Sequence, residues 1–314
     1  MKRALANALN IYGDIFRKYG LLGIFVAIYL TFVLVYQNVK WLFLLRKKEA
    51  VVDIHGSKMW LDYKSVGLDL SSSSIIKQLA LDKTREVEAT NEMLKILKKD
   101  DVVLEVGANI GYYALMAAKR IGSAGKVFAI EPEPANVSML NKNVSLNNYG
   151  KNIEVFPYAV SDKDGTVSLE VSKFSNRHKL AGAATGDNVI DVKSVTIDSF
   201  LRDKPAPTLI RMDVEGAEVA VFRGAQRTLE KKTPMNIFME VHPREIRGLG
   251  QDITALFKQL QGWGFEISAL ILFDRNIRRK VGFTKKAKIT IDQLLTLDPI
   301  VNGDEAFELF LTRS

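Results

Sequence analysis

The sequence predicts an α/β fold built on a parallel sheet, and two stretches carry this prediction. In DVVLEVGANIG, residues 101–111, an apolar run ends in a glycine turn, and the helix-like YYALMAAKRIG follows. In KVFAIEPEP, residues 126–134, a second strand-like run leads into a segment with apolar residues at helical spacing. Such strand–turn–helix units bring the carboxyl ends of their strands to one edge of a sheet, where open α/β sheets bind ligands.

The turn after the first strand indicates what this edge binds. Gly107 and Gly111 permit a ligand to approach the backbone closely. A dinucleotide pyrophosphate would call for G-x-G-x-x-G, but Asn109 and Tyr112 stand at the later glycine positions. The sequence therefore argues against a narrow phosphate cradle.

S-adenosylmethionine (SAM) fits this turn better because it carries no phosphate. Its zwitterionic end needs amide donors and carboxylates, which we expect the turn and Glu105 to provide. Glu131, 26 residues further on, stands where a carboxylate binds two ribose hydroxyls. The alternative is a structural glycine turn beside a surface glutamate.

Composition narrows the function classes. A chain of 314 residues with 47% hydrophobic content can bury one full core and an accessory segment. Cysteine is absent, which excludes disulfides, thiolate metal sites and nucleophilic cysteine chemistry. The net charge is +8, but residues 1–50 hold eight Lys or Arg against two acids, so most of the excess lies outside the catalytic candidate.

Residues 19–39 predict a single membrane anchor. These 21 residues carry no formal charge, and basic residues flank them on both sides. As a helix they would span about 31 Å, close to the roughly 30 Å core of a bilayer. No small-x-small cleavage site follows, which argues against a signal peptide. A helix docked on the domain or lying in the membrane plane is the alternative. Because SAM is cytoplasmic, we expect the carboxyl-terminal domain there, although basic flanks orient the span weakly.

The chain divides into three predicted parts. Residues 1–50 form the basic segment with the anchor, and residues 51–85 form a lead-in hairpin and a linker. Residues 86–314 form the main domain, and its βα alternation is interrupted by a strand-rich insert at about 164–203. The loop of this insert offers three candidate substrate contacts, which by default are simply solvated: Asn176, Arg177 and His178.

Three further stretches bring polar groups to the predicted sheet edge. IEVFPYAVSD reads as a third strand that ends beside the expected adenine, with Asp162 as a partner for the adenine amino group. TLIRMDVEGAE, residues 208–218, ends in a carboxylate cluster, and MNIFMEVHP ends in Glu240 and His242. These acids and the imidazole are expected to form one pocket.

The pocket suggests acid–base chemistry. We expect Asp213 or His242 to be the general base, while Glu215 and Glu240 bind hydroxyls of the acceptor. A divalent cation held by Asp213, Glu215 and Glu240 is an alternative that the sequence does not favour. Glu240 and His242 could also be a hydrogen-bonded pair that fixes a loop.

The terminal segments predict a helix and a pair of strands. FEISALILF and EAFELFLTR are the strands, and between them residues 275–288 hold seven Lys or Arg and no acid. This basic segment is by default a solvated loop. Beside a membrane it could contact anionic lipid or an anionic substrate.

Taken together, these motifs resemble the FkbM-type SAM-dependent methyltransferases. The resemblance covers roughly residues 51–314, and it is carried by GSKMWLDY, EVGANIGYYAL, AIEPEPANVSMLNKNVSLNN, PYAVSD, IRMDVEGAE, FRGAQRTL and EVHP. It implies a class I methyltransferase (Rossmann-like) fold, with a seven-stranded sheet whose last strand is antiparallel. It also implies O-methylation of a hydroxyl on a glycan, a lipid-linked sugar or a secondary metabolite. The apolar segment lies outside the resemblance.

The resemblance also implies roles for single residues. The methionine end of SAM would be held by the loop, namely Glu105, Gly107, Ala108, Asn109 and Gly111. Glu131 would bind the ribose, and the adenine side would comprise Asn136, Ala159 and Asp162. Asp213 and Glu215 would form the reaction centre. Glu105 departs from the Asp that such proteins often have at this position.

Two other function classes compete with a membrane-tethered O-methyltransferase. A nucleic-acid methyltransferase is suggested by the basic charge, but no Asn/Asp-Pro-Pro-Tyr step follows Met212, and the charge forms no stripe with aromatic residues. The other is a non-catalytic SAM-binding scaffold on the membrane, against which the carboxylates at 213–218 argue. The sequence indicates neither the acceptor nor the oligomeric state.

Overall fold

The computed structural model describes residues 20, 22–66, 74–171, 179–180, 188–274, 277–278 and 281–314. The described residues form two compact units. One lies within Met1–Ala50 and Leu61–Asp82, and the other within Val51–Trp60 and Lys83–Ser314. The loop with Asn176, Arg177 and His178, and part of the basic segment 275–288, lie outside the described residues. The three-part division predicted from the sequence stays a prediction.

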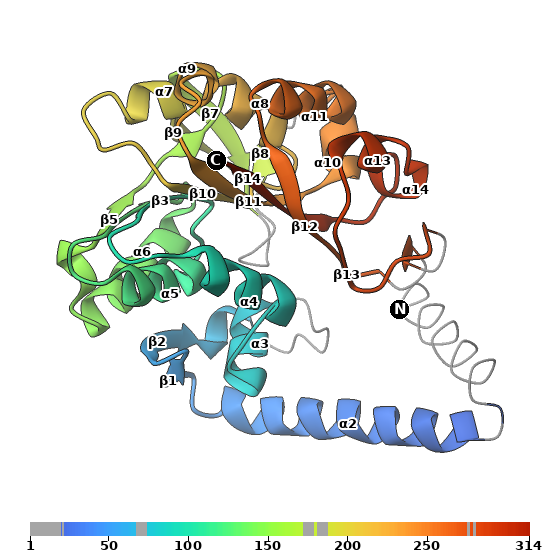
Figure 1. Cartoon of the computed structure of the whole chain (residues 1–314). Helices are drawn as coiled ribbons and strands as arrows, with labels where there is room; N and C mark the ends of the chain where they lie inside the picture. Colours follow the sequence, from blue (N-terminus) through green and yellow to red (C-terminus); the bar gives the residue numbers. More distant parts are fainter. Residues whose placement is uncertain are drawn as a thin grey trace. The chain divides into compact units, whose positions relative to one another are not determined.

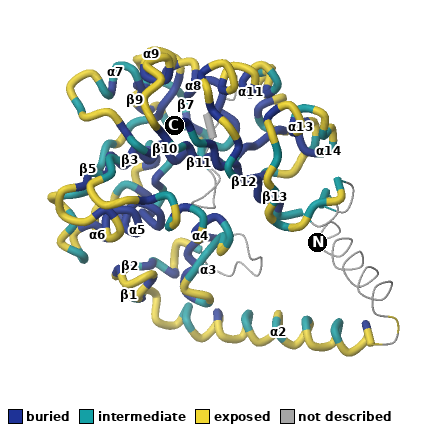
Figure 2. Tube along the Cα trace, viewed as in Figure 1, coloured by how far each residue is buried: buried dark blue, intermediate teal, exposed yellow. Residues whose placement is uncertain are grey.

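The first unit contains the apolar helix α2, Leu22–Leu45, with η1 (Tyr63–Ser65) and α3 (Ile75–Asp82). Trp41 is fully buried against the ring of Tyr63, with ring centroids 5.4 Å apart. Most other side chains of α2 are exposed, as Figure 2 shows. Within the described residues, α2 is the one helix long and apolar enough to cross a membrane. It runs six residues beyond the predicted end at Val39, and Lys40 within this extension donates to the carbonyl of Leu81.

A small hairpin precedes the main domain. Strands β1 (Glu49–Ile54) and β2 (Ser57–Asp62) form a two-stranded sheet around a turn in which His55 and Gly56 both have positive φ. The backbone N–H groups of Lys58 and Trp60 donate to the side chains of Asn147 and Asn143. The hairpin that the sequence predicted is therefore fastened to the end of α6.

The main domain is built on a mixed eight-stranded sheet (Figure 1). Its order is β13 (Lys286–Ala287), β12 (Glu266–Leu272), β14 (Phe307–Arg313), β11 (Met235–Val241), β10 (Leu209–Met212), β3 (Val102–Val106), β4 (Lys126–Ile130), β5 (Ile153–Phe156). From β5 to β11 the neighbours are parallel, whereas β14 is antiparallel to both β11 and β12. The sequence predicted seven strands, and the two-residue β13 adds an eighth at the edge of β12.

Helices cover both faces of this sheet. Figure 1 shows α4 (Val87–Ile96), α5 (Tyr112–Ile121) and α6 (Pro134–Leu146) on one side, and α8 (Glu218–Arg223), α9 (Gln226–Glu230) and α11 (Ile253–Gly262) on the other. The remaining short helices are η2 (Tyr149–Lys151), α7 (Ile197–Phe200), α10 (Pro243–Gly248), α13 (Ile291–Leu295) and α14 (Asp298–Val301). Because β10 and β4 lie on opposite sides of β3, the chain order reverses at β3. The carboxyl end of β3 is therefore the place where such a sheet binds its ligand.

Two predicted elements are divided in the structure. The predicted third strand splits into β5 and β6 (Ala159–Val160), because Pro157 has no N–H to continue the ladder. The predicted helix after Ala217 splits into α8 and α9 at Gly224, where a side chain would collide with the carbonyl of Ser161. Proline therefore sets the first break, whereas Gly224 marks the second and permits the close approach of the Ser161 carbonyl.

The strand-rich insert forms a second sheet. Its order is β6, β9 (Val189–Val195), β7 (Gly165–Glu170) and β8 (Lys179–Leu180). Strands β7 and β9 pair antiparallel over six residues, so the predicted hairpin is present. A small apolar cluster of Ala159, Leu169 and Val192 holds it together.

Candidate functional site

The loop after β3 is shaped by three residues with positive φ. Gly107, Asn109 and Gly111 have φ values of 80°, 50° and 96°, which suit glycine and, among larger residues, asparagine. A side chain at Gly107 would also strike the carbonyl oxygen of Asp213. Glycine at this position therefore lets the end of β3 lie directly against the end of β10.

The N–H groups of this loop are already used within the protein, which differs from the expected supply of free amide donors. Gly107 and Ala108 donate to the carbonyl of Ile130 over 2.9 and 3.0 Å. Asn109 donates to Glu131, and Ile110 donates to the side chain of Asn109. The loop therefore presents a fixed surface for a ligand, and the polar contacts must come largely from side chains.

The carboxylate of Glu131, just after the end of β4, is held by three hydrogen bonds. Its Oε2 accepts from the N–H of Asn109 at 2.7 Å, and its Oε1 accepts from the N–H of Glu133 at 3.0 Å and from Asn136 Nδ2 at 3.3 Å. Burial raises the pKa of Glu131 to about 7, although these three hydrogen bonds oppose the shift. The carboxylate is thus held rigidly beside the loop, and its predicted contact with a ribose stays a prediction.

The residues predicted for the adenine side each have their own contacts, and their contact with adenine stays a prediction. Asn136 is buried and bonded to Glu131, so it positions that carboxylate. Ala159 packs into the apolar cluster of the insert, with β6 paired to β9. Asp162 is exposed in the segment that follows β6, where its Oδ1 accepts from Ser161. Of the three, Asn136 is the one that contacts another predicted cofactor residue.

An arginine that the sequence analysis did not single out links the loop after β3 to Asp213 at the end of β10. Arg211 on β10 is paired in register with Glu105 on β3, and its Nη1 lies 3.7 Å from Glu105 Oε1. The same side chain donates to the carbonyl of Gly107 and to Asp213 Oδ2, and it lies over the ring of Tyr113. A lone charge in the apolar strand LIRM, two residues before Asp213, was the available signal.

Glu105 lies beneath the loop in a dry environment. It is 1% exposed, and within the described residues neither of its carboxylate oxygens has a hydrogen-bond partner. Burial raises the pKa of Glu105 to about 8, and the nearby Arg211 only partly opposes this. Its predicted contact with the methionine end of a cofactor stays a prediction.

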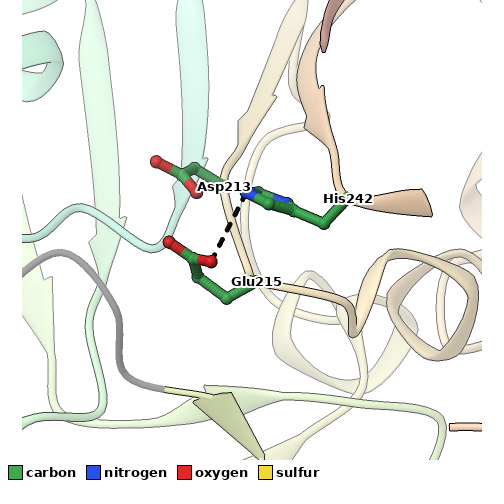
Figure 3. Close-up of side chains that lie close together, drawn as sticks. All are labelled: Asp213, Glu215 and His242. Carbon is green, nitrogen blue, oxygen red and sulfur yellow. Dashed lines mark ion pairs between the residues drawn. The ribbon is translucent and has the colours of Figure 1, made fainter. Parts of the chain in front are cut away.

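The predicted reaction residues meet at the carboxyl ends of β10 and β11. Figure 3 shows Asp213, Glu215 and His242 close together, with a dashed line joining Glu215 to the ring of His242. His242 Nε2 lies 3.5 Å from Glu215 Oε2 and 3.7 Å from Glu240 Oε1. The turn at Glu215 and Gly216, with φ of 48° and 104°, brings the chain from β10 into α8 within a few residues. We call Asp213, Glu215, Glu240 and His242 the edge cluster.

Glu218, a fully buried residue at the start of α8, fixes the imidazole. Its Oε1 lies 2.7 Å from His242 Nδ1. Burial lowers the pKa of His242, but the hydrogen bond to Glu218 and the charges of Glu240, Glu218 and Glu215 outweigh it and hold that pKa well above its usual value. The imidazole is therefore both oriented and strongly polarised by its acidic neighbours.

The carboxylates of the edge cluster differ in their electrostatics. Burial raises the pKa of Asp213, but Arg211, His242 and Arg85 outweigh burial, so the net shift of that pKa is downward. Burial raises the pKa of Glu215 to about 7 and that of Glu240 to about 8. Asp213 is thus the carboxylate most firmly ionised.

Three further charged residues surround Glu240, and the spacing of the sequence motifs did not indicate them. Arg85 and Glu86, which form an ion pair, lie at the start of α4, and Tyr113 donates its hydroxyl to Glu86 Oε2. Glu308 on β14 stands opposite Glu240 in register and is fully buried. Burial, with Glu86 and Glu240 adding to it, raises the pKa of Glu308 well above its usual value. The single acid in the largely apolar strand FELFLTR could have indicated this residue.

Comparison with known proteins decides the family. The family model described as the methyltransferase FkbM domain matches residues 105–267, more than half of the chain. The chain belongs to the FkbM methyltransferase family. The matched region is therefore a SAM-dependent methyltransferase domain, and it contains the loop after β3, Glu131 and the edge cluster.

Curated relatives are distant and match only in part. The hexuronic acid methyltransferase AglP of Haloferax volcanii is 25% identical over 166 residues, which cover 50% of this chain and 64% of the relative. The 2-O-methyltransferase NoeI of Sinorhizobium fredii is 24% identical over 191 residues, which cover 54% and 77%. The chain thus spans just under two thirds of the length of AglP.

Solved structures show likeness at low identity. A methyltransferase FkbM from Methylobacillus flagellatus is 20% identical, with a TM-score of 0.33 and coverage of 45% of this chain and 32% of that one. A SAM-dependent O-methyltransferase from Thermotoga maritima is 12% identical, with a TM-score of 0.40 and coverage of 85% and 86%.

Proposed function

We propose that this protein transfers the methyl group of SAM to a hydroxyl of a glycan, a lipid-linked sugar or a secondary metabolite. The observation that carries the proposal is the closeness of two sites at one sheet edge. Gly107 in the cofactor loop lies against the backbone of Asp213, the first residue of the edge cluster. A cofactor held by the loop and Glu131 would therefore present its methyl group beside these acids and the imidazole.

Methyl transfer from a sulfonium is an in-line displacement, and alignment of oxygen, methyl and sulfur supplies much of the rate. The new O–CH₃ bond forms as the S–CH₃ bond breaks, and the hydroxyl proton must leave. We assign the proton acceptor to Asp213, or to His242 when its ring is neutral, with Glu215 and Glu240 binding neighbouring hydroxyls. The edge cluster suits a polyhydroxylated acceptor because it offers several hydrogen-bond acceptors close together.

The acceptor class is supported by the relatives. The names of AglP and NoeI describe methylation of a hexuronic acid and methylation at a 2-O position. Both names fit an oxygen on a sugar. We assign this chain the same kind of acceptor, with the individual sugar left to experiment.

We further propose that α2 anchors the protein in a membrane, with the methyltransferase domain in the cytoplasm, where SAM is made. The 24-residue helix is about 36 Å long, enough to cross a bilayer core of roughly 30 Å. Its exposed apolar side chains support this assignment. A lipid-linked acceptor would then lie on the same surface as the enzyme.

The test is methyl labelling of fractionated acceptors. The full-length protein in detergent would be incubated with methyl-labelled SAM and separate pools of glycan, lipid-linked glycan and RNA from the host. We expect label in a carbohydrate pool. The Asp213→Asn variant should lose this labelling but still bind S-adenosylhomocysteine (SAH), the demethylated product of SAM. Label confined to RNA, or binding of SAH with no transfer to any pool, would contradict the proposal.

A further inference from the structure

Three side chains of the edge cluster form a compact set of metal-type donors. Asp213, Glu215 and His242 each offer one ligand atom, and these atoms all lie within 4.8 Å of one another. Asp213 and Glu215 come from the turn between β10 and α8, and His242 follows the end of β11 (Figure 3). The sequence suggested Glu240 as the third metal ligand, whereas the structure groups His242 with Asp213 and Glu215.

The orientation of His242 is a separate observation that points to a ligand. Its Nδ1 is 2.7 Å from Glu218 Oε1, so Nδ1 carries a hydrogen and Nε2 faces the acids. A histidine fixed through its other nitrogen by a carboxylate is the usual arrangement of a metal-binding histidine. Nε2 is 3.5 and 3.7 Å from Glu215 and Glu240, longer than a hydrogen bond of ordinary length. The side chain is also 8% exposed, so bulk water reaches it poorly.

The local charge balance favours a cation at this point. Arg211 pairs with Asp213. Among the described residues, no Lys or Arg forms an ion pair with Glu215 or Glu240, and both contact His242. One imidazole, with Arg85 acting on Glu240 through its charge, faces three carboxyl groups: Glu215, Glu240 and Glu218. A divalent cation between the acids and Nε2 would supply the missing positive charge.

We infer that Asp213, Glu215 and His242 bind one divalent cation, with Glu218 orienting the histidine. This inference rests on the proposed O-methyl transfer and deepens it. Two carboxylates and one imidazole suit first-row ions such as Mn²⁺ or Zn²⁺. Three protein ligands leave coordination positions open for the acceptor oxygen.

The cation changes the chemistry assigned to the edge cluster. A coordinated hydroxyl loses its proton more easily because the cation stabilises the alkoxide. The O–H bond breaks with its proton passing to the ionised form of Glu240, which is not one of the ligands. The oxygen then forms its bond to the SAM methyl group, and the S–CH₃ bond breaks to leave SAH. His242 and Asp213 would then act as ligands instead of bases.

The test measures metal binding directly, without activity. Full-length protein in detergent, first treated with EDTA, would be titrated with Mn²⁺ while the spin-resonance signal of free Mn²⁺ is followed. We expect one Mn²⁺ per chain. Asp213→Asn, Glu215→Gln and His242→Gln should each abolish it, and Glu218→Gln should weaken it roughly 10- to 100-fold.

Glu240→Gln is the matched control, because it removes a charge from the same cluster without removing a ligand, and it should leave one Mn²⁺ bound. SAH binding, measured on each variant, reports that the domain is folded. Mn²⁺ binding that survives in both Asp213→Asn and His242→Gln, or no binding below about 1 mM Mn²⁺, overturns the inference. Methyl transfer at the full rate in EDTA also overturns the inference of a metal site but leaves the methyltransferase assignment unaffected. Failure of the wild-type protein to bind SAH would overturn the methyltransferase assignment itself.

Discussion

Replacing Glu131 by glutamine probes the cofactor site most sharply. The carboxylate accepts three hydrogen bonds from the protein, through both of its oxygens. Glutamine accepts through one end only, so at least one donor loses its acceptor, and the ribose loses its ionised partner. A hydrogen bond to a charged group contributes about 1.5–3 kcal/mol, so losing the ribose pair costs about 3 kcal/mol. SAH should therefore bind roughly 100-fold more weakly.

Titration calorimetry with SAH measures this loss, and thermal unfolding of the same variant measures folding separately. The control is Glu133→Gln, because Glu133 is also buried and caps α6 by accepting from the N–H of Asn136. Glutamine can keep that cap, so SAH affinity should stay near the wild-type value. Unchanged SAH affinity in folded Glu131→Gln would refute the role given to this carboxylate.

Three further predictions concern pH, stability and the membrane. Because the pKa of Glu131 is raised to about 7, its carboxylate is protonated below that pH, and SAH should bind about tenfold more weakly at pH 6 than at pH 8. The Glu131→Gln variant should lose this pH dependence. A wild-type SAH affinity that is the same at pH 6 and pH 8 would contradict the role of Glu131. The pKa of Glu308 is higher in the folded protein than in the unfolded chain, where it is about 4.3. Glu308 therefore contributes fully to stability below that pH, and this contribution is lost as the pH rises. Glu308→Gln should therefore unfold at a higher temperature than wild type at pH 7.5 but not at pH 4, and an equal difference at both would contradict this account. Phe32→Arg, in the middle of α2, should make the free energy of membrane insertion about 3 kcal/mol less favourable. The variant should therefore move from the membrane to the soluble or aggregated fraction. Its retention in carbonate-washed membranes would contradict a membrane span.

Local chemistry was sufficient to predict the elements that carry the site. The glycines of the loop after β3 and the acid at the end of β4 are both set by short-range rules of backbone conformation and strand periodicity. The same rules placed Asp213 and His242 at the ends of neighbouring parallel strands. Parallel topology then determines that these ends meet.

Residues whose role depends on tertiary neighbours were beyond such rules. Arg211 and Glu308 act on residues of adjacent strands, and Arg85 reaches the same region from the start of α4. Their partners lie far away in the sequence, so spacing says nothing about them. The use of the loop N–H groups was missed for the same reason, since the acceptor is the carbonyl of Ile130 on β4.

The breaks in regular structure were predictable only in part. Pro157 ends β5 by a rule that can be read from the sequence. The break between α8 and α9 falls at Gly224, where the carbonyl of Ser161 leaves no room for a side chain, and this contact is visible only in the fold. The position of β13 likewise follows from pairing with β12 and not from its own two residues.

The measurement that tests the central claim most directly is calorimetry of the full-length protein with SAH. The account predicts one SAH per chain, bound by the loop at Gly107 and by Glu131. No heat with SAM or SAH, together with binding of a nicotinamide dinucleotide, would contradict it.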